Sequence, residues 1–279
     1  MSASGTEIRR GKGGKPRRAH LHTGRSKLHL GMIGAAPILL LIIAWFAATG
    51  PLGLIAPLKF PSPATTLASL ETIAGPGYAG APLLVHIETS LSLVLAGFAA
   101  ATLTGIPLGL LLGCNRYANA FINPVFQLLR PIAPIAWIPL TILWFGLGDI
   151  AKIFVVWLAA FAPAVINTQT AVRGVNRTIV EAARVHGANS AHLFLDVTIP
   201  AALPGIFTGL QLSLQACWMV LVAAELVGAY AGLGHVMMVA TDDLDPGMIF
   251  VAMLCVAMLG VAMSLFLARL EAWVLPWRR

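Results

Sequence analysis

The chain has 279 residues, of which 58% are hydrophobic and only 10% charged, and its mean hydropathy is +0.85. Because soluble domains carry about 25% charged residues, this composition excludes an ordinary soluble protein. Backbone polar groups in lipid need internal partners, so the composition predicts several membrane-spanning helices. The net charge of +7 does not indicate a nucleic-acid partner, since eight of the 18 Lys and Arg residues lie within the first 27 positions without an aromatic platform.

Residues 1–29 are basic, rich in glycine and almost free of bulky apolar residues, so we predict a disordered cytoplasmic tail. This tail is too long and too charged for an ordinary signal peptide. From residue 30 to residue 279 we predict an all-α polytopic membrane domain with about six transmembrane helices. The spans are expected at residues 31–49, 88–113, 131–148, 152–169, 206–227 and 247–268.

The distribution of Lys and Arg predicts the orientation of these spans. With the N-terminus inside, the cytoplasmic pieces hold 16 of the 18 basic residues, Arg130 among them. Lys59 and Lys152 are then left for the outer side. Because the opposite orientation would invert this bias, we expect both termini in the cytoplasm.

Two outer loops are expected to contain short helices. The first loop, residues 50–82, has an apolar-periodic stretch over 65–73 that Ser62 or Thr65 can cap as a helix. The loop between the fifth and sixth spans is expected to hold a short re-entrant or surface helix over 235–240.

The longest polar interval lies between the fourth and fifth spans and is patterned like a structured element. It contains Glu181-Ala182-Ala183 and then Gly187, which is expected to break the preceding helix. The spacing of apolar residues over 188–197 predicts a short amphipathic helix. Pro200 and Pro204 are expected to stop any helix from running through into the next span. Such a segment would project from the membrane domain as a stiff knob and dock onto a soluble protein.

Catalytic motifs are absent from the sequence. It contains no G-x-x-x-x-G-K-[ST] phosphate-binding loop, no H-E-x-x-H zinc motif and no G-x-S-x-G nucleophile motif. Cys114, Cys217 and Cys255 show no paired spacing, so we interpret them as small buried apolar residues. We therefore expect neither enzymatic activity nor a metal site in this chain.

Few polar groups lie within the spans, and each has two interpretations. Glu225, near the outer end of the fifth span, is either a pathway or gating residue or a structural hydrogen-bond partner. An ionisable group costs up to about 2.5–3.5 kcal/mol at the centre of a membrane helix, so it should face protein or a cavity. Gln211 and Gln215 share a helix face that either lines a path or joins helices.

The tryptophans within the spans are typical of membrane interfaces or helix packing. The exception is Trp144-Phe145-Gly146, because the prolines of the third span make that helix irregular and a suitable wall for a translocation path. The candidate path residues are Trp137, Trp144, Phe145, Gln211, Gln215, Trp218 and Glu225.

Motifs in a fixed order resemble those of ABC importer permeases. Glu181-Ala182-Ala183, Gly187, Ile199-Pro200 and Leu203-Pro204 are similar to the EAA loop of that family, although the family often has a single Leu-Pro. Further motifs resemble the subgroup for nitrate, taurine and alkanesulfonates and look closest to taurine permeases. They are Phe60-Pro61-Ser62-Pro63, residues 129–140, residues 143–149 and residues 222–226.

This resemblance covers residues 30–279 and implies the MetI-like fold of type I ABC importer permeases, in a bacterial inner membrane. Its implied partners are a second permease copy, two cytoplasmic ATPases that bind ATP and Mg, and a periplasmic substrate-binding protein. Residues 170–205 would form the cytoplasmic coupling loop, with a coupling helix that enters a groove of the ATPase. The residues assigned to ATPase coupling are Glu181, Ala182, Ala183, Gly187, Ala188, Asn189, Ser190, Ala191, His192, Leu193, Phe194, Pro200 and Pro204.

The implied function is ATP-driven import of a small anion that the binding protein delivers, and a taurine-like or other sulfonate is favoured. Nitrate or another small organic anion is the alternative within the same machinery. A transporter of a different class, driven by an ion gradient, would need a coupling-ion site near the membrane midplane. Glu225 is the candidate acid for such a site.

Overall fold

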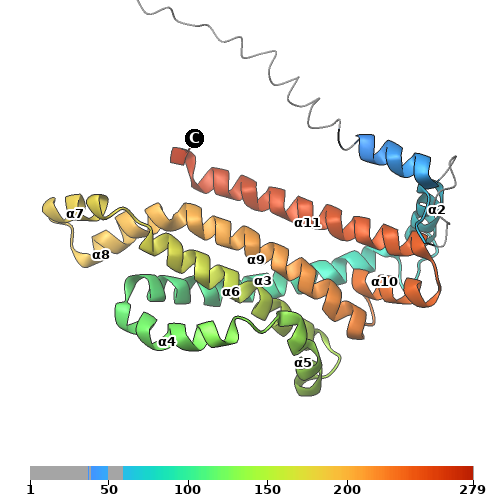
Figure 1. Ribbon diagram of the computed structural model, residues 1–279, viewed down its shortest axis with the longest axis horizontal. Helices are drawn as coiled ribbons and strands as arrows, with labels where there is room; N and C mark the ends of the chain where they lie inside the picture. The colour runs from blue at the N-terminus through green and yellow to red at the C-terminus, as the bar shows by residue number, and fades with distance from the viewer. Residues whose placement is uncertain (1–36, 38, 50–58, 279) are drawn as a thin grey trace, which may run out of the picture.

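The computed structural model describes residues 37, 39–49 and 59–278, and the regular elements among them are helices (Figure 1). The expected tail at 1–29, residues 31–36 and 38 of the first span, and the loop stretch 50–58 lie outside the described residues. In chain order the elements are α2 (Pro63–Ala74), α3 (Leu83–Cys114), α4 (Arg116–Leu129), a 3-10 turn (Pro134–Trp137), α5 (Ile138–Phe145), α6 (Asp149–Arg173), α7 (Arg177–Val185), α8 (Ser190–His192), a π-helical turn (Leu193–Thr198), α9 (Ile199–Gly228), α10 (Leu233–Asp242), α11 (Pro246–Val274) and a final 3-10 turn (Pro276–Arg278).

Four of the described helices are long and apolar enough to cross a membrane, namely α3, α6, α11 and the joined helix Ser190–Gly228. The bent pair Arg116–Leu129 and Pro134–Phe145 would add a fifth if it forms one span. Helix Leu39–Thr49 is apolar but shorter. The expected all-α polytopic class is confirmed, and the described part of the chain supplies four or five candidate spans rather than six.

The region of the expected third span, residues 131–148, is not one straight helix. Helix α4 ends at Leu129, and the helix Pro134–Phe145 follows at an angle of 80° to it. This second helix consists of the 3-10 turn and α5, and a proline occupies the first turn of each, where its missing N–H group is not needed. A proline also disfavours helical conformation in the residue before it. The break therefore follows from the prolines, and residues expected between two spans form α4.

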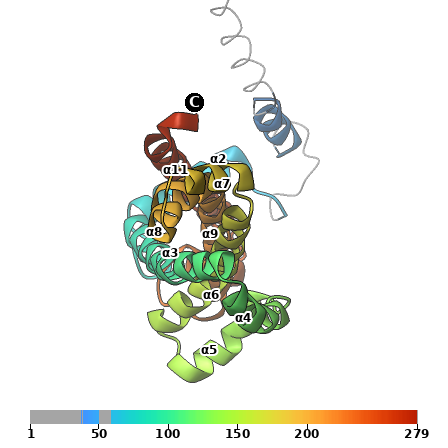
Figure 2. The same ribbon diagram turned by 90° about the vertical axis from the view of Figure 1, so that its left-hand side faces the viewer.

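Helix α6 packs between α3 and α9, and small residues on both neighbours allow a close approach (Figures 1 and 2). These small residues recur at multiples of four positions: Gly97, Gly105, Gly109 and Gly113 on α3, and Gly205, Gly209 and Ser213 on α9. A Cβ atom added to Gly109 would lie only 2.8 Å from the carbonyl oxygen of Val165. The Ser213 hydroxyl donates a hydrogen bond of 2.8 Å to the Ala160 carbonyl. Backbone contact of this kind is typical of helix packing in membranes.

The motif Phe60-Pro61-Ser62-Pro63 connects helix Leu39–Thr49 with α2 and α11. The Trp45 Nε1–H donates to the Pro61 carbonyl at 2.9 Å, and the Trp45 ring centroid lies 4.9 Å from that of Phe250 on α11. Ser62 caps α2 by accepting the N–H of Thr65 at 3.2 Å. The helix expected over 65–73 is therefore confirmed, as is the short helix expected over 235–240, which is α10.

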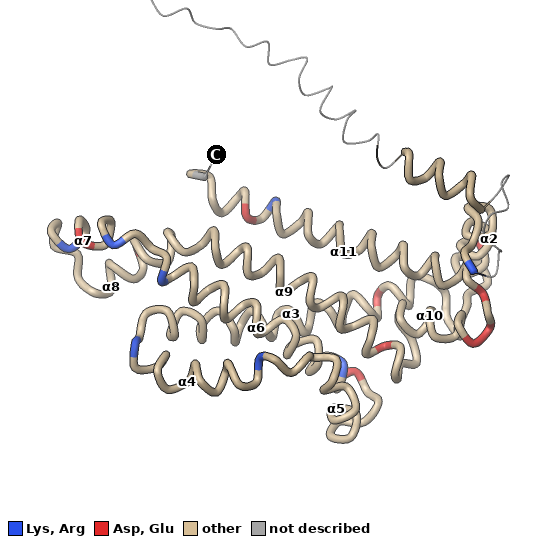
Figure 3. Tube along the Cα trace, viewed as in Figure 1, with Lys and Arg blue, Asp and Glu red and all other residues tan. Residues whose placement is uncertain are grey.

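The two ends of the bundle differ in charge (Figure 3). Lys and Arg mark the end that holds α7, α8 and the turn between α3 and α4. Asp and Glu gather near α2 and α10 at the other end. This separation is the property from which the sequence predicts the orientation of the spans.

We predict that Gly109→Val weakens the contact between α3 and α6, because the added methyl groups would meet backbone that cannot move aside. Overpacking a core in this way costs about 1–3 kcal/mol. The measurement is thermal unfolding of the purified chain in mild detergent. Ala99→Val is the matched control, since Ala99 lies on the exposed face of the same helix. Equal unfolding temperatures for the two variants would contradict the packing described here.

Candidate functional site: coupling segment, buried carboxylate and central cavity

The stretch from Glu181 to Ala188 forms the end of α7 and a cap that favours glycine. The N–H of Gly187 donates to the Arg184 carbonyl at 2.9 Å, and the N–H of Ala188 donates to the Ala183 carbonyl at 3.1 Å. These two bonds are the Schellman pattern that ends many helices. Gly187 has a φ of +86°, and a Cβ atom there would meet nothing within 4 Å. Glycine is therefore favoured by backbone conformation and not by lack of space, and it ends the helix as expected.

The helix that follows Gly187 differs from the one expected over 188–197. It begins at Ser190, because Asn189 caps it by accepting the His192 N–H at 2.9 Å. It then continues through the π-helical turn into α9 without a break. Neither Pro200 nor Pro204 stops it: Pro200 comes directly after the wider π-helical turn, and Pro204 is accommodated inside α9. The expectation that these prolines end the helix is wrong.

The coupling segment, which we define as residues 177–198, projects beyond the ends of α3 and α6 (Figure 1). None of the residues in α7, α8 or the π-helical turn is buried. Val185 is 85% exposed, and Ile179 and Leu195 are more than half exposed. Exposed apolar side chains on a projecting element are suited to contact with another protein.

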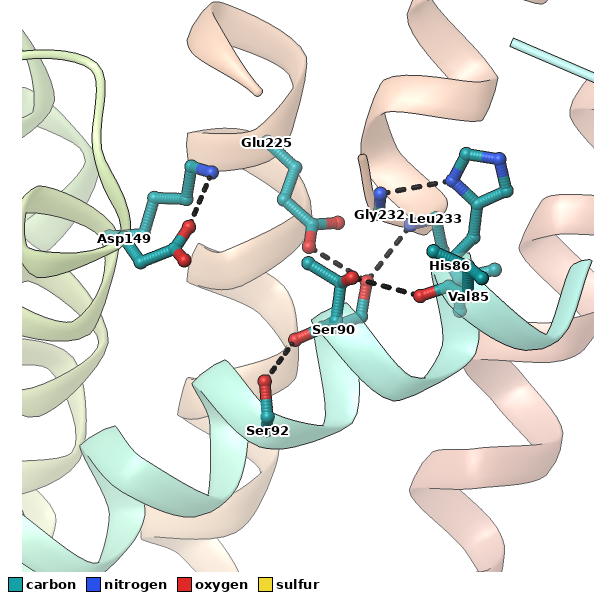
Figure 4. A network of polar contacts seen from close by, with 10 residues as sticks. Val85, His86, Ser90, Ser92, Asp149, Glu225, Gly232 and Leu233 are labelled. Carbon is teal, nitrogen blue, oxygen red and sulfur yellow. Dashed lines mark hydrogen bonds and ion pairs between the residues drawn. The ribbon is translucent and has the colours of Figure 1, made fainter. Parts of the chain in front are cut away.

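Glu225 is 1% exposed and holds the N-terminus of α10 (Figure 4). Its Oε1 accepts the Ser90 hydroxyl at 2.7 Å, and its Oε2 accepts the Gly234 N–H at 2.8 Å. The Ser90 oxygen in turn accepts the Leu233 N–H at 2.9 Å. The first N–H groups of a helix have no partner within the helix and favour negative charge, so this carboxylate satisfies α10 by hydrogen bonding and by electrostatics.

Glycines allow the carboxylate to approach α10. A Cβ atom at Gly234 would lie 2.6 Å from the Glu225 Cβ, and Gly232 adopts a φ of +128°. The structure therefore supports the structural interpretation of Glu225, because both of its oxygens are engaged inside the protein. Lys152, which is 5% exposed, pairs instead with Asp149 at 3.1 Å.

His86 extends this network to the loop that precedes α3. Its Nδ1 accepts the Gly232 N–H at 3.1 Å, so the proton lies on Nε2, which donates to the Tyr78 carbonyl at 3.0 Å. The Tyr78 hydroxyl donates to Asp243 at 2.5 Å. Burial raises the pKa of the Tyr78 phenol, and the hydrogen bond to Asp243 raises it further. The phenol therefore stays protonated and keeps its bond as pH rises through its ordinary titration range.

A cavity of about 680 Å³ lies beside α6, between α4 and the turn that leads to α5. Trp137, one of the expected path residues, lines it. So do Phe126, Leu129, Ile132, Pro134, Leu158, Ala159, Phe161, Ala162, Pro163, Ile166 and Leu212, all of them apolar, and the polar residues Arg130 and Asn167. We call this space the central cavity.

A second cavity of about 250 Å³ adjoins the first and shares Phe126, Arg130 and Ile166 with it. Its other lining residues are polar: Asn123, Gln127, Gln169, Thr170 and Arg173. Arg130 follows directly after the 14 residues of α4, so it lies about 20 Å along that helix from Arg116. The sequence placed Arg130 in a cytoplasmic piece. In the structure Arg130 is exposed at the end of α4 and lines both cavities.

The other expected path residues lie elsewhere. Trp144 and Phe145 pack against Phe154 of α6, with ring centroids 6.4 and 5.5 Å apart. Trp218 is 6% exposed and belongs to the core between α3, α6 and α9. Gln211 donates to Glu271 of α11 at 3.0 Å, which supports the interpretation that it joins helices. Gln215 is exposed on the face of α9 that also carries Leu212, one turn from the central cavity.

Comparison with protein-family models matches residues 105–279 to the family described as the binding-protein-dependent transport system inner membrane component. The chain belongs to this family. The resemblance of its motifs to ABC importer permeases is thereby confirmed, and the chain is a membrane permease component rather than an ATPase.

Two curated relatives are similar to this permease over most of its length. The taurine transport system permease protein TauC of Escherichia coli (strain K12) is 37% identical over 85% of this chain and 86% of its own. The bicarbonate transport system permease protein CmpB of Synechococcus elongatus is 34% identical over 90% and 92%. Among solved structures, an inward-facing MetNI methionine ABC transporter matches with a TM-score of 0.61 and 20% identity, over 69% of this chain and 95% of that one. This last likeness confirms the expected fold.

Several residues of the permease escaped sequence reasoning. Ser90 and His86 lie on α3, far along the chain from Glu225, so no local motif connects them. Gly232 and Gly234 lie against Glu225 in the fold, but no sequence motif connects them with the carboxylate. Only the spacing of four between small residues on α3 and α9 offered a signal that the sequence itself carries.

We predict that Ser90→Ala loosens the N-terminus of α10. The change removes the donor to Glu225 and leaves the buried Leu233 N–H without its acceptor, which costs about 1–3 kcal/mol for an unpaired group. Hydrogen–deuterium exchange at Leu233 and Gly234 should accelerate while exchange in α6 stays slow. Ser92→Ala is the matched control, because Ser92 is exposed on the same helix and bonds only the Thr89 carbonyl. Unchanged exchange in Ser90→Ala would show that the network does not hold α10.

Proposed function

We propose that this permease is the membrane subunit of an ATP-driven importer for a small anion, in a bacterial inner membrane. Two copies would assemble with two cytoplasmic ATPases, which bind ATP and Mg, and with a periplasmic substrate-binding protein. The observation that carries this proposal is the coupling segment, in which none of the described residues of α7, α8 or the π-helical turn is buried. Family membership supports the same assignment.

Motion would reach the membrane through α9. The coupling segment and α9 share one helix, Ser190–Gly228, of 39 residues and therefore about 60 Å in length. Closure of the ATPases on ATP would displace the coupling segment, and the helix would carry that displacement to Glu225 and α10. Such a two-state change between inward-open and outward-open forms is biased by ATP at one end and by the binding protein at the other.

The basic end of the bundle is assigned to the cytoplasm. The coupling segment lies there, the C-terminal end of α11 points toward it, and Lys and Arg favour the cytoplasmic side (Figures 1 and 3). The Lys and Arg of the first 27 residues favour the same side for the N-terminus. The binding protein would then approach α2 and α10 at the opposite end.

A sulfonate such as taurine is the favoured substrate, since the relative with 37% identity is named for taurine transport. Bicarbonate or nitrate is the alternative within the same machinery, because another relative is named for bicarbonate. Transport driven by an ion gradient is less well supported, because both carboxylate oxygens of Glu225 accept hydrogen bonds inside the protein.

We predict that Gly187→Val separates the permease from its ATPase. A β-branched residue is strongly disfavoured at the φ of +86°, whereas asparagine tolerates it, and neither side chain would meet another atom near Cβ. About 1.4 kcal/mol of backbone strain should reduce ATPase recovery with the tagged permease roughly tenfold. The measurement is co-purification in mild detergent from the native host.

Gly187→Asn is the matched control and should retain the ATPase. Equal recovery with Gly187→Val and wild type, with both inserted in the membrane, would contradict the coupling assignment. Failure of any ATPase to co-purify with wild type would turn attention to the ion-gradient alternative.

A further inference from the structure

The two adjoining cavities along α6 have a chemical character that the proposed importer function does not by itself specify. We propose that Arg130 binds the acidic group of the transported substrate, and that the central cavity accepts an organic anion with an apolar body rather than an inorganic anion. This inference rests on the proposed function, since it concerns the substrate of that importer.

The charge of the lining favours anions. Among the described residues, none that lines either cavity is Asp or Glu, whereas Arg130 lines both and Arg173 lines the second. The ion pair found in the described part of the chain joins Lys152 and Asp149, so Arg130 is not neutralised by a carboxylate there. Arg173 donates one of its five N–H groups, from Nη2, to the Leu112 carbonyl at 3.1 Å. Arg130 is the guanidinium that lines the central cavity.

Arg130 is exposed and lines both cavities, so a substrate moving along α6 would meet it. The central cavity follows α6 from Leu158 to Asn167, and the second cavity follows it from Ile166 to Arg173 at the helix end. The two spaces are therefore stacked along α6, with Arg130 at their junction. An anion that leaves the central cavity toward the basic end of the bundle would pass this guanidinium.

The lining of the central cavity favours a substrate with an apolar body. Phe126, Trp137 and Phe161 contribute rings, and Asn167 is the one polar residue beside Arg130. The Asn167 amide already donates to the Pro163 carbonyl at 2.8 Å. Nitrate or bicarbonate would lose its hydration here and gain few donors in exchange, because beside Arg130 only Trp137 and Asn167 of the lining carry side-chain N–H groups. An alkyl or aryl sulfonate or carboxylate would place its acidic group on Arg130 and bury its body against those walls.

The test is the binding of pentanesulfonate to the full-length permease with its co-purified ATPase in nanodiscs, measured by calorimetry against empty nanodiscs. We expect Arg130→Gln to weaken binding at least tenfold, as loss of a charge-assisted hydrogen bond does. Arg116→Gln is the matched control and should bind as wild type does. It removes the same charge from the other end of α4, where the guanidinium contacts Tyr117 outside both cavities.

Two further comparisons test the cavity itself. Ala162→Phe fills the central cavity without changing its charge and should also weaken pentanesulfonate binding, which keeps the proposal testable if Arg130→Gln fails to fold. Along the series from methanesulfonate to pentanesulfonate, each added CH2 should tighten binding by roughly threefold to fourfold in wild type. Nitrate should bind more weakly than pentanesulfonate.

Equal affinity in wild type, Arg130→Gln and Ala162→Phe would overturn the proposal, as would tighter binding of nitrate than of pentanesulfonate. A change of oligomeric state in Arg130→Gln without a change in affinity would assign the cavity to contact between permease copies and would also overturn it. Loss of the ATPase from wild type would count against the importer function instead, because pentanesulfonate binding to the permease can still be measured.

Discussion

The unbroken helix from Ser190 to Gly228 is the constraint on which the rest of the structure depends. It begins in the exposed coupling segment, passes α6 through Gly205, Gly209 and Ser213, and carries Glu225 near its far end. The π-helical turn makes this continuity possible, because it widens the helix just before two prolines. In the proposed importer, this helix would join events at the two ends of the permease mechanically.

The bend after α4 has the opposite effect on the neighbouring side of α6. Because Pro134–Phe145 turns away by 80°, it does not continue α4 as one straight span along α6, and the central cavity lies at the bend. The same bend leaves Arg130 at the junction of the two cavities. One side of α6 thus packs closely against glycines, and another side borders the two cavities.

Much of this fold follows from the sequence, because apolar length, the positions of Lys and Arg, and local capping signals are properties of short segments. Ser62, Gly187 and α10 behave as their neighbours in the chain predict. Contacts between segments that are far apart in the chain could not be predicted from the sequence. The bonds from Ser90 to Glu225 and from His86 to Gly232 join residues more than 130 positions apart, and no local pattern specifies them.

The prolines show where local rules fail. Pro200 and Pro204 were expected to end a helix, yet the helix Ser190–Gly228 continues through both of them. Pro134 and Pro139, in contrast, accompany a real break. The same residue type therefore has opposite outcomes, and the register of the preceding hydrogen bonds decides between them. That register is set by tertiary packing, which a single sequence does not reveal.

The most direct measurement is uptake of radiolabelled taurine into proteoliposomes that contain the permease with its ATPase and binding protein. The importer account predicts uptake that requires ATP and Mg on the ATPase side and persists when ionophores collapse every ion gradient. Uptake by the permease alone that follows an imposed ion gradient and ignores ATP would contradict it.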